Sequence, residues 1–175
     1  MGIQVQRRAR GGGAGGRVVV LSSTACLDLA APLDLREAPR ADPKSGAPAR
    51  ARYAESKAMN VLFADALAAR EGRALWAYSA APGPTATLGV RYELPRRYEQ
   101  RRGMTAEQLG RQARQLGLRT PEEAAGGLLG LAVATPPPAP GFYQDEELVP
   151  GAEWAPWRTP EAAEQLWALS ESLLP

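Results

Sequence analysis

The sequence contains no histidine and only a single cysteine, Cys26, among its 175 residues. One cysteine cannot form an internal disulfide, and without histidine the usual ligands of a structural zinc site are missing, so the sequence predicts no metal site. A reducing compartment fits this cysteine usage best. We therefore expect an intracellular, cytoplasmic protein, with targeting to an organelle left open.

Long apolar runs and a strong net charge are also lacking. The longest uninterrupted apolar run near the start, Val18 to Leu21, is far shorter than the roughly 20 residues of a membrane-spanning helix. The 21 basic and 19 acidic side chains give a net charge of +2, which creates little long-range field for attracting nucleic acid or anionic lipid. We expect no transmembrane segment and no nucleic-acid partner.

The composition indicates one globular domain that follows a short tail. Residues 1–16 are rich in glycine and arginine and cannot bury apolar area, so we expect a flexible tail there. The chain as a whole is 45% apolar and 23% charged, which lies in the ordinary globular range, and residues 17–175 are long enough for a core.

The first half of this domain has the pattern of a strand, a helix and a second strand. Val18–Leu21 is typical of a short, fully buried strand in a parallel sheet. Residues 25–52 contain four prolines and no sustained period, which predicts an excursion over the surface. A helix then ends at Glu71-Gly72, and residues 74–78 form a strand candidate that stops before Pro82. The apolar face of that helix is predicted to include Met59, Leu62, Phe63 and Ala66, with Asp65 turned outward.

The second half contains three further helix candidates and one short strand. Residues 104–116 and 120–134 are expected to be helical, and the latter opens with Thr120 as N-cap, Pro121 and two acids in the first turn. Residues 141–144 form a strand candidate, and a terminal helix begins at Thr159. The predicted fold class is α/β, with part of a doubly wound parallel sheet.

Tyr53 and Lys57 are the residues most suited to chemistry. A spacing of four on a helix places the phenol and the ammonium on one face, about one turn apart. The phenol of a free tyrosine has a pKa of about 10, and a neighbouring cation favours its ionised form, which makes proton exchange easier at neutral pH. Ser23 follows a parallel strand, where open α/β sheets keep their sites, and its hydroxyl could hold a carbonyl oxygen against Tyr53.

These residues resemble the second half of the short-chain dehydrogenase/reductase superfamily, in the order in which that family has them. The resemblance is closest to the retinol dehydrogenase-like and protochlorophyllide reductase-like branch, and it covers about residues 17–175. The segments that carry it are Val18-Val19-Val20-Leu21-Ser22-Ser23, then Tyr53-x-x-Ser56-Lys57-x-x-Asn60-x-x-Phe63, then Pro82-Gly83-x-x-x-Thr87, and the tail Leu166-Trp167-Ala168-Leu169-Ser170-Glu171.

The resemblance implies an NAD(P)-dependent oxidoreductase acting on a lipophilic alcohol or carbonyl compound. Tyr53 would be the acid/base, Lys57 would assist it and hold the nicotinamide ribose, and Ser23 would steady the substrate oxygen, with Ser22 as a substitute. The residues implied to line the nicotinamide are Pro82, Gly83, Thr85 and Thr87. The cofactor would be NADP or NAD, and a homo-oligomer is compatible with the family.

The family's nucleotide-binding half is not found in this sequence. Gly11, Gly13 and Gly16 match Gly-x-Gly-x-x-Gly literally, but that motif needs a strand before it and a helix after it, whereas here a strand follows. We therefore expect a truncated catalytic half, whose sheet would have an open edge. Two alternatives stay open: a non-catalytic binding module without cofactor, and a sugar-nucleotide epimerase or dehydratase with the same serine, tyrosine and lysine.

Other conspicuous residues have simpler explanations. Cys26 lies near the candidate serine but has no histidine to activate it, so we interpret it as a small apolar residue. Trp154 and Trp157 fit a substrate rim or the packing of the C-terminal segment equally well. A basic stretch is interpreted as a solvated face, and it consists of Arg96, Arg97, Arg101 and Arg102.

Overall fold

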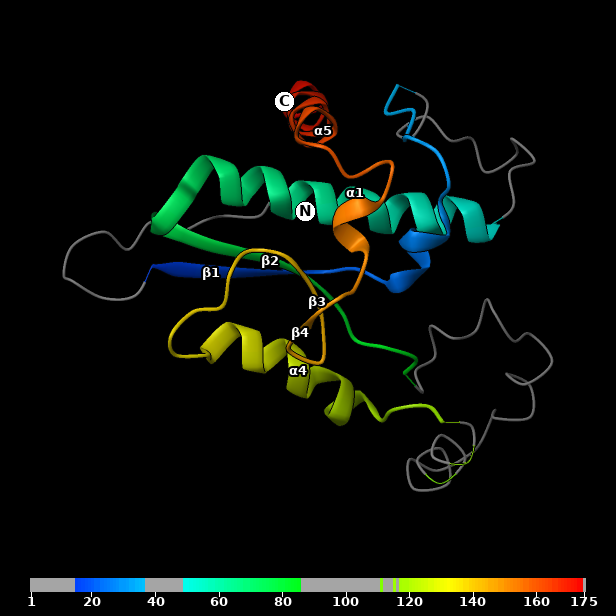
Figure 1. Ribbon diagram of the computed structural model, residues 1–175, viewed down its shortest axis with the longest axis vertical. Helices are drawn as coiled ribbons and strands as arrows, with labels where there is room; N and C mark the ends of the chain where they lie inside the picture. The colour runs from blue at the N-terminus through cyan, green and yellow to red at the C-terminus, as the bar shows by residue number, and fades with distance from the viewer. Residues whose placement is uncertain (1–14, 37–48, 86–110, 112–114, 116, 175) are drawn as a thin grey trace.

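The computed structural model describes residues 15–36, 49–85, 111, 115 and 117–174, and within them the fold is α/β (Figure 1). The sheet formed by these residues has four strands in the order β1-β2-β3-β4, of which β1, β2 and β3 are parallel and β4 is antiparallel to β3. The strands are β1 (Gly16–Leu21), β2 (Leu75–Ala81), β3 (Phe142–Gln144) and β4 (Glu147–Leu148). The helices are α1 (Ala49–Glu71), α4 (Pro121–Val133) and α5 (Pro160–Ser172), with short 3-10 turns η1 (Thr24–Asp28), η3 (Gly72–Ala74) and η5 (Ala152–Trp154).

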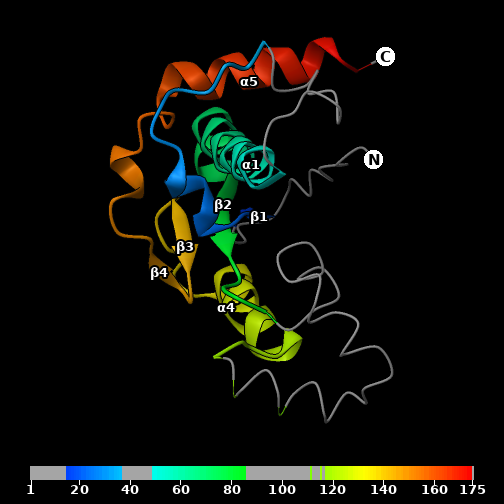
Figure 2. The same ribbon diagram turned by 90° about the vertical axis from the view of Figure 1, so that its right-hand side faces the viewer.

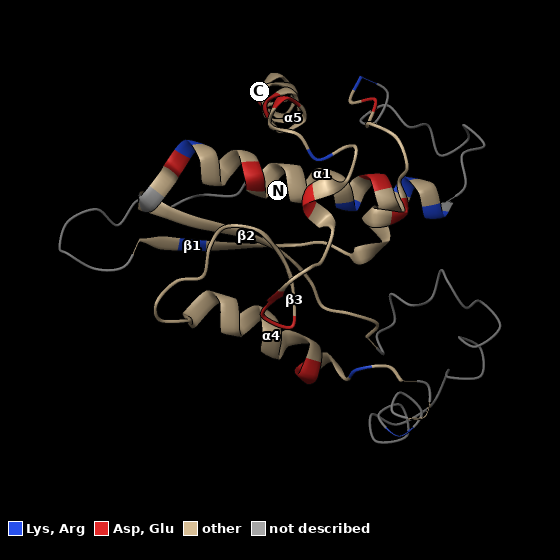
Figure 3. Cartoon of the chain, viewed as in Figure 1, with Lys and Arg blue, Asp and Glu red and all other residues tan. Residues whose placement is uncertain are grey.

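Helices cover both faces of the sheet. Figure 2 shows α1 on one face with α5 packed outside it, and α4 on the opposite face. Because α1 lies between the sheet and α5, it buries residues on two sides, and Val61 and Leu62 are both fully buried. Charged residues of both signs lie along α1, whereas α4 carries charge only in its first turn (Figure 3).

The expected strand–helix–strand unit is confirmed. The strands β1 and β2 pair in parallel from Gly16 opposite Leu75 to Leu21 opposite Ala80, and α1 connects them. The helix ends at Glu71, and Gly72 follows with a φ of +53°, a conformation that glycine adopts at little cost. The second strand is longer than predicted because residues 79–81 also pair with β3.

The prediction that Val18–Leu21 is fully buried is wrong. Val18, Val19 and Val20 are only half-buried, and Leu21 is 47% exposed. The cause is the position of β1 in the sheet, since among the described residues it pairs with β2 on one side and with no strand on the other. The expected open edge is therefore present in this part of the chain.

The prediction of a surface excursion over residues 25–52 is also wrong at both of its ends. Cys26 in η1 is fully buried and Leu35 is 7% exposed, and both belong to the main core cluster. At the other end, α1 already begins at Ala49. An ion pair of 2.8 Å between Arg50 and Asp28 links the first turn of α1 to the last residue of η1. Residues 37–48 lie outside the described part of the chain.

The surroundings of Asp65 and Trp157 depend on tertiary contacts that no local sequence pattern reveals. Asp65 does not face outward, because both of its carboxylate oxygens accept hydrogen bonds from Arg158 at 2.7 and 2.9 Å. Trp157 is 1% exposed and its indole N–H donates to the Cys26 carbonyl oxygen at 3.0 Å, whereas Trp154 is 83% exposed. The packing interpretation therefore holds for Trp157 and not for Trp154.

The predicted starts of the last two helices are confirmed. Thr120 caps α4, and Glu123 completes a capping box by accepting a hydrogen bond from the Thr120 amide at 2.8 Å. Thr159 caps α5, where its hydroxyl accepts a hydrogen bond from the Ala162 amide at 3.1 Å. The helix predicted at 104–116 lies almost wholly outside the described residues. No helix in the described part of the chain combines the length and the apolar character needed to cross a bilayer.

The strand candidate at 141–144 is confirmed as β3, whereas β4 was not predicted. A two-residue turn joins the two strands, and its residues Asp145 and Glu146 have φ angles of +56° and +67°. Such turns usually carry asparagine, aspartate or glycine at the first position and glycine at the second. Asp145 fits this preference and Glu146 does not, which explains why the hairpin was not predicted.

Candidate functional site

The candidate site lies at the carboxyl ends of β1 and β2. Ser22 and Ser23 follow β1 directly, and Pro82 and Gly83 follow β2. Because the two strands are parallel, both segments leave the sheet at the same edge. The N-terminal half of α1, which carries Tyr53, passes beside them. Open α/β sheets bind ligands at this edge.

Lys57 connects the end of β1 with Tyr53. Its Nζ lies 3.5 Å from the carbonyl oxygen of Leu21, the last residue of β1, and 5.5 Å from the centroid of the Tyr53 ring. Tyr53 is 43% exposed, so a ligand can reach its ring edge. The spacing of four residues therefore has the predicted result, a phenol and an ammonium on one face of α1.

Asn60 donates to the same Leu21 carbonyl oxygen as Lys57. Its Nδ2 donates to Leu21 at 2.8 Å, one helical turn beyond Lys57. Asn60 belongs to the segment that carries the family resemblance, but no role was predicted for it. Its spacing of three from Lys57 was the available signal, because residues three apart on a helix are neighbours. In the structure Asn60 fixes α1 to the end of β1.

The two serines after β1 differ in their surroundings. Ser22 is 2% exposed, and its hydroxyl donates to the main-chain carbonyl of Lys57 at 2.7 Å. Ser23 is half-buried and caps η1, accepting a hydrogen bond from the Ala25 amide at 3.2 Å. A hydroxyl that accepts a bond can still donate its own hydrogen. The surroundings therefore favour Ser23 over Ser22 for contact with a substrate oxygen.

The segment after β2 forms a tight turn. Gly83 has a φ of +71°, and the hydroxyl of Thr85 donates to the Gly83 carbonyl at 3.0 Å. Thr85 also pairs with Arg119 in an isolated parallel bridge. Pro82 and Gly83 are half-buried beside the strand end. Thr87, the fourth residue expected to line a nicotinamide, lies outside the described residues.

Of the three glycines in the literal Gly-x-Gly-x-x-Gly match, Gly16 alone lies in the described part of the chain. Gly16 is the first residue of β1, and a Cβ built there would lie 3.0 Å from a methyl carbon of Leu75. Gly11 and Gly13 are outside the described residues, as are Arg96, Arg97, Arg101 and Arg102.

A cleft of about 660 Å³ lies elsewhere, between α1, α5 and the β3–β4 hairpin. None of the predicted site residues lines it. Its walls are mainly apolar, and they include Ala66, Phe142, Val149 and Ala163 beside the Asp65–Arg158 ion pair.

No family model, no curated protein and no solved structure matches this chain. Its function has to be inferred from the residues and their geometry.

Proposed function

We propose that this chain carries the proton-transfer residues of an NAD(P)-dependent oxidoreductase that interconverts an alcohol and a carbonyl compound. The observation that carries the proposal is the position of Lys57, whose Nζ lies 3.5 Å from the Leu21 carbonyl at the end of β1 and 5.5 Å from the Tyr53 ring centroid. One ammonium therefore lies near both the end of β1 and the ring of Tyr53, and this position supports the proposal.

Each residue has a defined task in the direction of carbonyl reduction. The Tyr53 hydroxyl donates its proton to the substrate oxygen, which becomes a hydroxyl, and the ammonium of Lys57 stabilises the negative charge left on the phenolic oxygen. Ser23 donates a hydrogen bond to the same substrate oxygen. The nicotinamide, when bound, supplies the hydride that reduces the carbonyl carbon and is itself oxidised. In the reverse direction Tyr53 takes the proton from the alcohol.

The described residues fit one end of a dinucleotide. An ammonium has three N–H donors, so the bond from Lys57 to Leu21 leaves capacity for the hydroxyls of a ribose. The turn at Pro82 and Gly83 stands at the same edge of the sheet. The pyrophosphate end is different, because no glycine-rich turn leads from a strand to a helix N-terminus within residues 15–36, 49–85 and 117–174. We therefore assign only the nicotinamide end to these residues.

The arrangement of layers supports a matching inference about the fold. Parallel strands β1 to β3, with α1 and α4 on opposite faces, are what part of a doubly wound, Rossmann-type sheet would contain. The half-buried valines of β1 then mark the side on which a further strand would pair.

Substitution of Tyr53 tests the catalytic part of the proposal. Tyr53→Phe should lower kcat for oxidation of medium-chain alcohols and reduction of the matching aldehydes by about 10²–10⁴-fold, with the dissociation constant for NADH or NADPH little changed. Tyr143→Phe is the matched control, since it removes a hydroxyl that bonds the Ala139 carbonyl at 2.6 Å on the other side of the sheet. Full turnover by Tyr53→Phe would refute the assignment.

The described residues contain no phosphate-binding turn, and this observation favours a second candidate function, a binding or interaction module without cofactor. Titration of the full chain with NADH and with NADPH separates the two. Cofactor at 100 times its dissociation constant stabilises a folded receptor by about 2.7 kcal/mol, which corresponds to a rise in Tm of roughly 5–10 °C for a domain of this size. No rise with either nucleotide would support the second candidate.

A further inference from the structure

The segment after β2 is held by Arg119, the residue before the N-cap of α4. The Arg119 amide donates to the Pro84 carbonyl at 2.8 Å, and Arg119 pairs with Thr85 as an isolated parallel bridge. These main-chain contacts keep the turn at Gly83 next to the start of α4. No local sequence pattern marks Arg119, so its contacts were not predicted.

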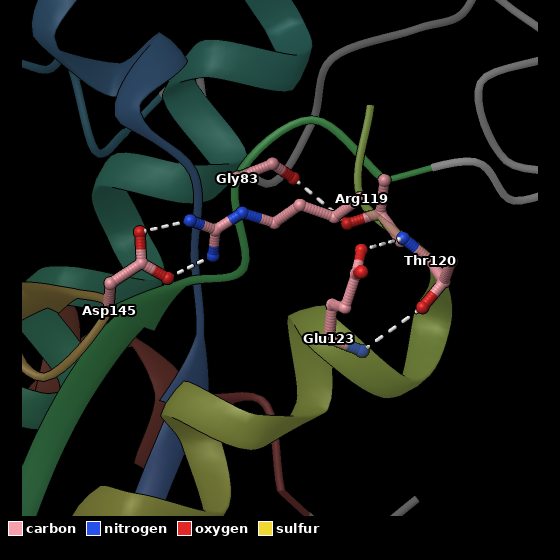
Figure 4. Close-up of polar contacts among 6 residues, drawn as sticks. Gly83, Arg119, Thr120, Glu123 and Asp145 are labelled. Carbon is pink, nitrogen blue, oxygen red and sulfur yellow. Dashed lines mark hydrogen bonds and ion pairs between the residues drawn. The ribbon is translucent and has the colours of Figure 1, made fainter. Parts of the chain in front are cut away.

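The side chain of Arg119 runs past Gly83 towards the β3–β4 turn. Its guanidinium forms a forked pair with both carboxylate oxygens of Asp145 in the β3–β4 turn (Figure 4). On the way it passes over Gly83: a Cβ built on Gly83 would lie 3.4 Å from the Arg119 Nε. Glycine is therefore favoured at position 83 for two reasons. It adopts the positive φ at little cost, and its lack of a side chain leaves room for Arg119.

Asp145 is also held in place by the packing of its turn against α4. The turn that carries it packs against α4, where a Cβ built on Gly127 would lie 3.3 Å from the Asp145 Cα, and one built on Gly130 would collide with the carboxylate of Glu146. Two glycines of α4 therefore let the hairpin turn approach the helix closely. The carboxylate that receives Arg119 is held by α4 and the hairpin, independently of the segment after β2.

We propose that Arg119 is a positioning residue that ties the segment Pro82–Thr85 to the unit formed by α4 and the β3–β4 hairpin, and so holds the nicotinamide-facing wall of the site in place. This inference rests on the function proposed above. Asp145 accepts from both terminal nitrogens of the guanidinium, and Arg119 contacts the segment after β2 at Gly83 and Pro84, so we assign it a role through these two residues. Glu123 belongs to the capping box of Thr120 and does not compete for the fork.

The test uses Asp145→Asn in the full chain, because this change removes the ion pair and leaves the Arg119 amide in place. Amide hydrogen exchange at Gly83, Thr85 and Arg119 should become about 10-fold faster. If only a tenth of the molecules then hold the wall in its binding geometry, the KM for the nicotinamide cofactor rises about 10-fold while kcat at saturation stays within about 2-fold. A merely structural loss would lower the amount of active enzyme with KM unchanged.

Two further variants keep the test decisive. Arg119→Lys retains the charge but not the fork, so it should show the same KM effect as Asp145→Asn even if the latter folds poorly. Glu164→Gln is the matched control, because it removes a comparable exposed pair with Arg70 on α1 and should change neither exchange at Gly83 nor KM.

The outcomes separate this inference from the proposed function. Unchanged exchange at Gly83, Thr85 and Arg119 in both test variants overturns the positioning role, whatever the activity. Faster exchange with an unchanged KM overturns the connection to the cofactor. Faster exchange in a chain whose unmodified form binds neither NADH nor NADPH supports the mechanical tie and refutes the proposed function.

Discussion

The hydroxyl of Ser22 donates a hydrogen bond of 2.7 Å to the main-chain carbonyl of Lys57, so the residue that follows β1 is tied directly to the helix that carries the candidate site. The Ser22 amide also donates to the Ala80 carbonyl of β2 at 2.7 Å. Ser22 is 2% exposed, and water cannot easily replace either bond. One serine thus joins both strands and α1 at the edge where Tyr53 lies.

Ser22→Ala should therefore act on stability. Removal of a buried hydroxyl partner is expected to lower the free energy of unfolding by about 1–2 kcal/mol, measured by urea denaturation. Ser56→Ala is the matched control, because the Ser56 hydroxyl bonds the Tyr53 carbonyl within α1 at 2.7 Å, a local contact whose loss should cost less than about 0.5 kcal/mol. Equal losses in the two variants would contradict the anchoring role of Ser22.

Local chemistry made several elements predictable. Thr120 and Thr159 each precede a proline and an acid, and they cap α4 and α5 as expected. The spacing of Tyr53 and Lys57 likewise predicted that they share a face of α1. What spacing could not predict is that Lys57 also reaches the Leu21 carbonyl, 36 residues earlier, because that contact depends on the packing of α1 against β1.

Two of the failures share one cause, which is that the residue that determines the position is remote in sequence. Asp65 looked exposed by helical period, but Arg158 is 93 residues away. Cys26 looked like part of a surface segment, but Trp157 bonds its carbonyl across 131 residues. The β3–β4 turn was missed for a local reason, since Glu146 adopts a positive φ at the position where such turns usually carry glycine.

The two tryptophans of the C-terminal segment should respond very differently to truncation. Trp157 is 1% exposed within the core cluster and Trp154 is 83% exposed. Trp157→Ala should lower the free energy of unfolding by about 3–5 kcal/mol through the cavity and the lost bond to Cys26. Trp154→Ala should stay within about 0.5 kcal/mol. Thermal or urea unfolding checks both, and a large loss for Trp154→Ala would mean that this side chain is covered in solution.

The pair of Arg119 and Asp145 should make stability depend on acid pH. The hydrogen bonds from Arg119 hold the pKa of the Asp145 carboxyl below its ordinary value. The unfolded carboxyl, with a pKa of about 3.9, therefore takes up protons before the folded one does. The contribution is fully present above that unfolded value, and it is lost as pH falls through the lower pKa of the folded state.

Comparison with Asp145→Asn isolates this contribution from other carboxylates. The difference in unfolding free energy between the two proteins should be no more than about 1 kcal/mol at neutral pH, since both partners are partly exposed, and it should shrink as the pH falls from 4 towards 2. Urea unfolding across that range, at low salt, provides the measurement. A difference that stays constant to pH 2 would show that the ion pair contributes nothing.

The thiol of Cys26 should be unreactive in the folded protein. Burial is the main cause that raises its pKa to about 11, compared with roughly 8.5 for an exposed thiol. Only the thiolate attacks disulfide reagents, so at pH 8 the folded chain should react on the order of 10²-fold more slowly than the chain in urea.

The raised pKa of Cys26 should also make the stability of the folded chain decrease at alkaline pH. Between the unfolded and the folded pKa, the unfolded thiol ionises and the folded one does not, so stability should fall as the pH rises from about 9 towards 11. Cys26→Ala lacks a titrating group and should lose this component of the decline. If the native thiol reacts with an aromatic disulfide as fast as the unfolded one, η1 must open far more readily than its burial against Trp157 implies.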